Sequence, residues 1–190
     1  MLGRILVAGA GGGVVLVLWS FVTNVLLGFR SRIDLNRVAN EGEVHALLKQ
    51  NVTAPGAYVV NPPLTPDGRF PPGEPVFGVR YGGMGHEAAG GLFLVELAVA
   101  FVAALLAAWL VSRASGRTPM SPWRAAGLLA LVGALIAVYS DLPRAGIAGY
   151  PWSSVLLLGA HDIAAWLLCG LAIGWLLRRA GGKASLSARA

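Results

Sequence analysis

Three ionisable residues stand inside otherwise apolar stretches of this sequence: Glu96, His161 and Asp162. Ionisable side chains are costly in apolar surroundings, so they pair with polar partners and by default raise a functional question. An imidazole beside a carboxylate could relay a proton, contact a quinone or supply ligands to a transition metal. Because neighbouring residues on a helix point about 100° apart, His161 and Asp162 can face different partners.

The common catalytic and metal-binding patterns are missing from the sequence. Cys169 is the only cysteine, and no HExxH motif or zinc-like Cys/His spacing occurs. Ser154 precedes His161 by two helical turns, which is too far for a serine nucleophile to reach its base. We therefore predict no catalytic residue and no cofactor. Haem, a chlorophyll-type pigment or a quinone near His161 remain open alternatives, and the metal is unknown.

Four apolar segments carry these residues. They cover residues 5–29, 88–112, 122–140 and 151–177. Each is long enough to cross a hydrocarbon core as a helix, which takes about 20 residues. The chain is 56% hydrophobic and 13% charged, whereas soluble domains carry about 25% charged residues. The sequence therefore predicts an all-α membrane protein, a four-transmembrane-helix bundle that forms one membrane domain over residues 1–190.

A cluster of glycines near the N-terminus suggests a different interpretation, the phosphate-binding turn of a dinucleotide enzyme. That motif, G-x-G-x-x-G, needs a small residue at each of its three glycine positions. Gly9 and Gly11 occupy the first two, but the third is Val14. The run from Ile5 to Phe29 is also longer than the apolar region of a cleaved signal peptide, about 7–15 residues. We interpret it as an uncleaved membrane anchor.

Polar residues of three segments fall at comparable depths. Counted from the outer surface, Glu96, His161 and Asp162 lie about 12–16 Å deep, and Ser20 and Asn24 lie near the outer end of the first segment. If the interior of the bundle collects them, these five residues form one buried polar patch. Three roles stay open for it: a structural contact that fixes helix register, a proton, ion or quinone site, and a metal or metal-cofactor site.

Small residues recur at a spacing of four in every segment, and such faces let helices approach closely in lipid. These helix-packing positions are Gly9, Gly13, Ala100, Ala104, Ala108, Ala126, Ala130, Ala134, Gly170 and Gly174. They predict an intramolecular bundle, with enough outer surface for one face to dock another subunit.

Residues 30–87 form the one long connection. A short helix is expected after Asn40, which forms a capping-box-like pattern with Glu43, and the runs GAYVV and VFGVRY are β-prone. Lys and Arg concentrate before the first segment, between the second and third segments, and after the fourth. The positive-inside rule places this end of the segments in the cytoplasm. We therefore predict an extracytoplasmic α/β loop domain over 30–87, a cytoplasmic tail over 178–190, and both termini in the cytoplasm.

Three short motifs resemble a loose group of uncharacterised bacterial four-span membrane proteins: GGGVVLVLWSFV at the start, PGAYVV in the loop and GYPW before the last segment. The resemblance implies the four-span layout and no particular activity. Abundant Ala, Gly and Arg are typical of a GC-rich bacterial genome, which places the protein in the cytoplasmic (inner) membrane of a bacterium.

These observations predict a non-catalytic accessory or stabilising subunit of a larger membrane complex, respiratory or photosynthetic. The expected partners are the lipid bilayer and other membrane subunits. Nucleic acid is not expected, because no basic cluster with interleaved aromatic residues occurs. The alternative is a transporter-like proton or ion protein, or a redox or quinone-binding protein, that uses Glu96, His161 and Asp162.

Overall fold

The computed structural model describes residues 2–33, 37–83, 85, 89–116, 118–145 and 149–187. The chain forms two compact units. One unit combines Met1–Asn36 with Phe93–Ala190, and the other is Arg37–Leu92. The first is helical and carries the apolar segments, while the second contains a short helix and a small sheet.

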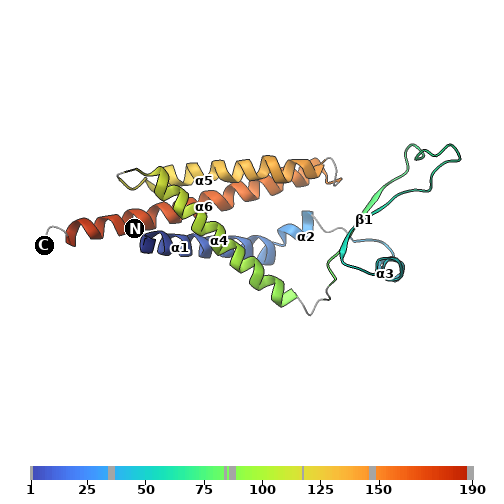
Figure 1. The fold of residues 1–190 in the computed structure, drawn as a ribbon, viewed down its shortest axis with the longest axis horizontal. Helices are drawn as coiled ribbons and strands as arrows, with labels where there is room; N and C mark the ends of the chain where they lie inside the picture. Colours follow the sequence, from blue (N-terminus) through green and yellow to red (C-terminus); the bar gives the residue numbers. More distant parts are fainter. Residues whose placement is uncertain are drawn as a thin grey trace. The chain divides into compact units, whose positions relative to one another are not determined.

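The helical unit consists of four long helices and short extensions. Its elements are α1 (Leu2–Ser20), η1 (Phe21–Leu26), α2 (Phe29–Ile33), α4 (Ala89–Ala114), α5 (Pro122–Ile136), η3 (Ala137–Asp141), η4 (Leu142–Ala145) and α6 (Trp152–Ser187). The α5 helix lies along α6, α1 lies along another side of α6, and α4 crosses α1 obliquely (Figure 1). Both η1 and η3 are π-helical turns that continue a long helix.

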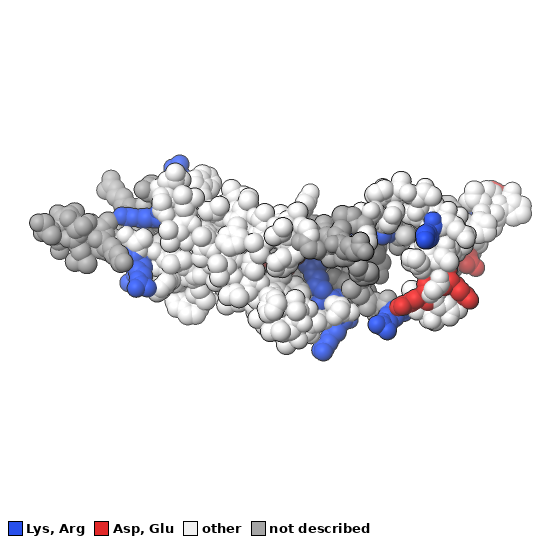
Figure 2. All heavy atoms as spheres, turned by 90° about the horizontal axis from the view of Figure 1, so that it is seen from below, with Lys and Arg blue, Asp and Glu red and all other residues white. Residues whose placement is uncertain are grey.

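Within the described residues, four helices are long and apolar enough to cross a membrane: Leu2–Leu26, Phe93–Ala114, Pro122–Ala145 and Trp152–Ala180. Many of their large apolar side chains point outward. On the face drawn in Figure 2, a broad band without charged side chains separates two groups of basic residues on the helical unit. The predicted four apolar helices are confirmed, with ends that differ by a few residues.

Small residues let the helices of this unit touch. A Cβ atom added to Gly170 of α6 would lie 2.7 Å from the carbonyl oxygen of Ala125 on α5. On α1, Gly9 and Gly13 pack against Leu105 and Phe101 of α4. The core therefore forms by close approach of the helix backbones. Membrane helices associate in this way because no hydrophobic driving force acts between them in lipid.

The predicted packing positions all lie partly or fully inside this unit. Seven are buried: Gly9, Gly13, Ala104, Ala108, Ala126, Gly170 and Gly174; three are half-buried: Ala100, Ala130 and Ala134. Gly12 and Gly133 make equally close contacts, with Ile173 and with the backbone of α6. The four-residue spacing did not single out these two, because each contact depends on which helix becomes the neighbour.

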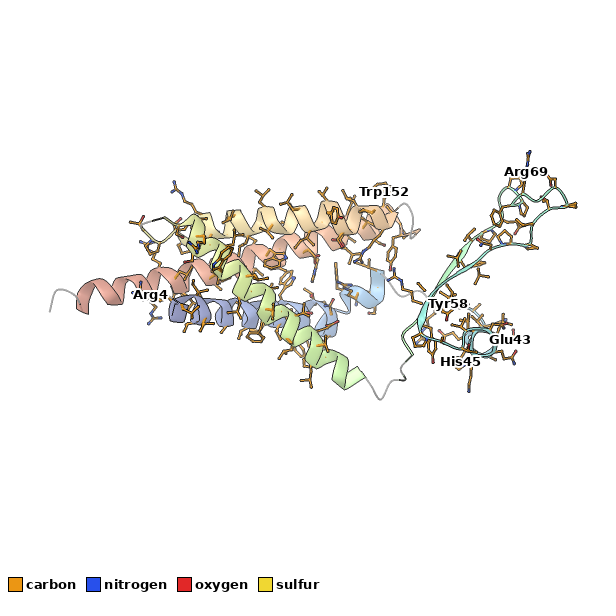
Figure 3. The ribbon with its side chains drawn as sticks, in the orientation of Figure 1. Arg4, Glu43, His45, Tyr58, Arg69 and Trp152 are labelled. Carbon is orange, nitrogen blue, oxygen red and sulfur yellow. The ribbon has the colours of Figure 1, made fainter. Side chains whose placement is uncertain are left out.

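The second unit contains α3 (Glu41–Asn51), β1 (Gly56–Val60) and β2 (Phe77–Tyr81). The strands pair antiparallel with Tyr58 opposite Val79, which confirms the two β-prone runs as a small sheet. Figure 3 labels Glu43 and His45 on α3 and Tyr58 on β1.

The start of α3 differs from the predicted capping box. The side chain of Asn40 makes no hydrogen bond with the helix backbone. Its amide instead donates to Oε2 of Glu43 at 3.3 Å. The Asn40 side chain therefore acts as a donor to Glu43, whereas a capping box requires its oxygen to accept from the helix backbone.

Candidate functional site

The imidazole of His161 on α6 makes two polar contacts. Its Nδ1 lies 3.0 Å from Oδ1 of the neighbouring Asp162, and its Nε2 lies 3.0 Å from Oγ1 of Thr23 on η1. The His161 side chain is 10% exposed. These contacts tie α6 to the end of the first apolar helix, far from it in sequence.

Two aromatic rings enclose the imidazole. Phe29 of α2 stacks on it with ring centroids 5.0 Å apart and an interplanar angle of 19°. Trp19 of α1 lies 5.6 Å away in a tilted arrangement. Gly28 sits between η1 and α2 at a φ of 61°, a conformation that costs other residues about 1–2 kcal/mol. The chain can therefore turn sharply here and bring Phe29 onto His161.

Thr23 is held by its own helix as well as by His161. It is 6% exposed, and its hydroxyl donates to the carbonyl oxygen of Trp19 at 2.8 Å. The residue lies within η1, a π-helical turn. Such turns widen a helix and occur frequently at functional sites. Here the widened turn presents a hydroxyl to an imidazole on another helix.

Asp141 is a buried acid at this end of the unit. It ends η3, is 4% exposed, and has Oδ1 at 3.6 Å from the guanidinium of Arg144. Its carboxyl also interacts electrostatically with Asp162, Arg30 and His161. Two π-helical turns thus bring polar side chains toward the same part of α6.

Several buried polar atoms near His161 have no hydrogen-bond partner within the described part of the chain. They are Nε1 of Trp19, Oδ1 of Asn24 and Oδ2 of Asp141. A buried polar group without a partner costs about 1–3 kcal/mol. One donor and two acceptors therefore remain available for further hydrogen bonds in this region.

The structure brings together only some of the residues of the predicted patch. His161 and Asp162 contact each other, and the amide of Asn24 donates to Oγ of Ser20 at 3.0 Å beside Thr23. Glu96 lies on an exposed part of α4 and makes none of these contacts. Whether the patch has a function stays a prediction.

Sequence reasoning left three residues out of the patch: Thr23, Phe29 and Asp141. Thr23 is polar in an apolar run and was a recognisable candidate beside Asn24. Asp141 directly follows the predicted end of the third segment at Ser140, although the helical path continues through it. The position of Phe29 depends on the turn at Gly28, which the apolar pattern does not reveal.

The described residues contain no group of three or more His, Cys, Asp and Glu side chains that could hold a metal ion. His161 and Asp162 together supply two possible metal ligands. Cys169 is buried elsewhere in the core. The arrangement can bind or pass a proton and can fix the register of two helices. Haem, a chlorophyll-type pigment and a quinone remain open alternatives.

Comparison with known proteins provides no family assignment: no family model, curated protein or solved structure matches this chain.

Proposed function

We propose that this protein is a non-catalytic accessory or stabilising subunit of a larger membrane complex in the bacterial inner membrane. The observation that carries the proposal is the position of Glu96. The C-terminal half of α4 is buried at Ala104, Ala108 and Val111, whereas Phe93–Glu96 is exposed. A carboxylate thus stands on an uncovered part of a helix apolar enough to span a membrane.

The apolar part of α4 begins at Phe93, so Glu96 stands about one helical turn inside it, nearer the end of the span than the depth of about 12–16 Å expected from the sequence. Ionisable residues in membrane helices almost always pair with other polar groups or face water. Ala100 and Ala103 follow Glu96 on the same side of α4, because residues three, four and seven apart share a helix face. Small residues there allow close approach. We assign this surface to a transmembrane helix of another subunit, with a basic or hydrogen-bond-donating side chain opposite Glu96.

The charge distribution supports the orientation that this proposal uses. One end of the four apolar spans, the arginine end, carries Arg4, Arg113, Arg124, Arg178 and Arg179. The opposite end carries fewer arginines: Arg30, Arg32 and Arg144. In Figure 3, Arg4 and Trp152 mark opposite ends of the helical unit. By the positive-inside rule the arginine end faces the cytoplasm, together with both termini, and residues 37–83 lie outside.

Site-specific photo-crosslinking tests the proposed interface. A benzophenone amino acid replaces Phe93, one turn before Glu96 on the same side of α4, or Leu94, which points away. Irradiation of native membranes should join position 93 to a second membrane protein, while position 94 should give mainly lipid adducts. Glu96→Leu should weaken the protein adduct at position 93, and Glu96→Gln should retain part of it. Equal protein crosslinking at both positions would refute this interface.

A second candidate function is transport of protons or ions, or redox chemistry with a quinone. The observation that favours it is the polar centre of His161, Asp162 and the buried acid Asp141. Acid and histidine chains of this kind form proton relays in membrane proteins. Reconstituted vesicles carrying a pH-sensitive dye should then show proton flux that His161→Leu abolishes and His45→Leu, on exposed α3, leaves intact. No difference between wild type and empty vesicles would reject the proton-transport form of this candidate.

A further inference from the structure

The two nitrogens of His161 face different chemical groups. Nδ1 lies 3.0 Å from Oδ1 of Asp162. An ionised carboxylate only accepts hydrogen bonds, so Nδ1 carries a hydrogen and donates it. The nitrogen that is left to gain or lose a proton is Nε2, on the side of Thr23.

Nε2 meets a hydroxyl that can either donate or accept. Oγ1 of Thr23 is 3.0 Å from Nε2, 2.8 Å from the carbonyl oxygen of Trp19 and 3.4 Å from that of Ser20. A hydroxyl has one hydrogen to donate and two lone pairs that accept. Thr23 can therefore donate to a bare Nε2, or accept from a protonated Nε2 while donating to Trp19.

We propose that His161 is a reversible proton-binding site in which the Thr23 hydroxyl switches between Nε2 and the Trp19 carbonyl oxygen. The incoming proton binds to the lone pair of Nε2. The hydroxyl hydrogen turns about the C–O bond of Thr23, so no covalent bond of the threonine breaks. Both nitrogens of His161 keep a hydrogen bond in both states, which lets the site take up and release a proton without leaving a buried group unpaired.

The charged groups around this site come from three elements besides α6. Asp162 contacts the ring from α6 itself, and Asp141 of η3 is coupled electrostatically to His161. Arg144 of η4, whose guanidinium lies 3.6 Å from Oδ1 of Asp141, and Arg30 of α2 offset the charge of Asp141.

Proton uptake would act on the helix as well as on the ring. The Trp19 carbonyl lies just before η1, where the regular helix α1 widens into the π-helical turn. A charged His161 releases the Thr23 hydroxyl to this carbonyl, whereas a neutral His161 takes it away. The proton site is therefore coupled to the backbone at the end of α1. It concerns the same centre as the transport candidate, but it requires neither transport nor a partner subunit.

Nitrogen NMR on the full chain in lipid nanodiscs tests the proposal directly. With ¹⁵N-labelled histidine, the His161 signals are assigned by their loss in His161→Leu and followed across a pH series. The expected neutral ring carries its hydrogen on Nδ1, and Nε2 is the nitrogen that titrates. Thr23→Ser should titrate like wild type. Thr23→Val should bind the proton severalfold more weakly, because a hydrogen bond to a charged ring is stronger than one to a neutral ring.

Two results would overturn the inference: a neutral His161 with its hydrogen on Nε2, or a Thr23→Val protein that titrates like wild type. The tautomer of the wild-type chain decides even if Thr23→Val does not fold. Because the measurement uses the isolated chain, its failure is distinct from failure of the accessory role or of transport.

Discussion

At the residue scale, His161 is defined by side chains that are remote from it in sequence. Its polar partner Thr23 and its stacked neighbour Phe29 both come from the N-terminal part of the chain. The sequence marked His161 and Asp162 because they interrupt an apolar run. It did not mark Phe29, because the turn at Gly28 that places this ring on His161 leaves no signal in the apolar pattern.

Phe29→Leu should destabilise the helical unit. The stacked arrangement of Phe29 on His161 adds about 0.5–1.5 kcal/mol beyond the area that the ring buries. Thermal unfolding of the purified chain in detergent, followed by circular dichroism, should show a lower midpoint. Phe21→Leu is the matched control, because Phe21 is 48% exposed and should change little. Equal effects of the two substitutions would mean that the stack contributes nothing.

At the element scale, the number of apolar helices could be predicted and their pairing could not. A helix that crosses a hydrocarbon core needs a length and composition that are visible in any window of the sequence. Pairing depends on which small-residue face meets which, and every predicted segment has such a face. The π-helical turns η1 and η3 were also not predicted, since their wider hydrogen-bond pattern leaves no periodic signal over a few residues.

Glycines at the α5–α6 contact give a clear test of close helix approach. Gly170→Ala places a methyl group 2.7 Å from two backbone atoms of Ala125 and Ala126, so α5 and α6 must separate. Overpacking of this kind costs about 1–3 kcal/mol. Gly127→Ala is the control, because its methyl group would meet nothing within 4 Å. Denaturation in mixed micelles should show Gly170→Ala to be the less stable protein. The reverse order would contradict the α5–α6 pairing.

At the scale of the whole molecule, the proposed role depends on how the chain lies in the membrane. The helical unit has arginines at the start of α1 and the end of α6, and the second unit contains the exposed turn near Arg69. The positive-inside rule predicts orientation from such an asymmetry and uses only residues near the helix ends. The orientation stays a prediction from the sequence, whereas the exposure of Glu96 became visible only in the structure.

Single-cysteine labelling should reveal this orientation. Cys169 is buried, so Cys169→Ala gives a background without native thiols. In that background, Arg69→Cys should react with a membrane-impermeant maleimide on intact spheroplasts. Gly3→Cys should react only after the membrane is opened. Labelling of Gly3→Cys from outside would reverse the predicted topology.

The most direct test of the accessory role is gentle detergent extraction of the C-terminally tagged chain from its native membranes. Mass spectrometry identifies every chain that is retained, and a visible absorption spectrum detects pigments. The account predicts at least one membrane protein in stoichiometric amount with the wild type, and its loss with Glu96→Leu but not with Val95→Ala. A colourless protein that is extracted alone would contradict the accessory role and shift the argument to His161 and its neighbours.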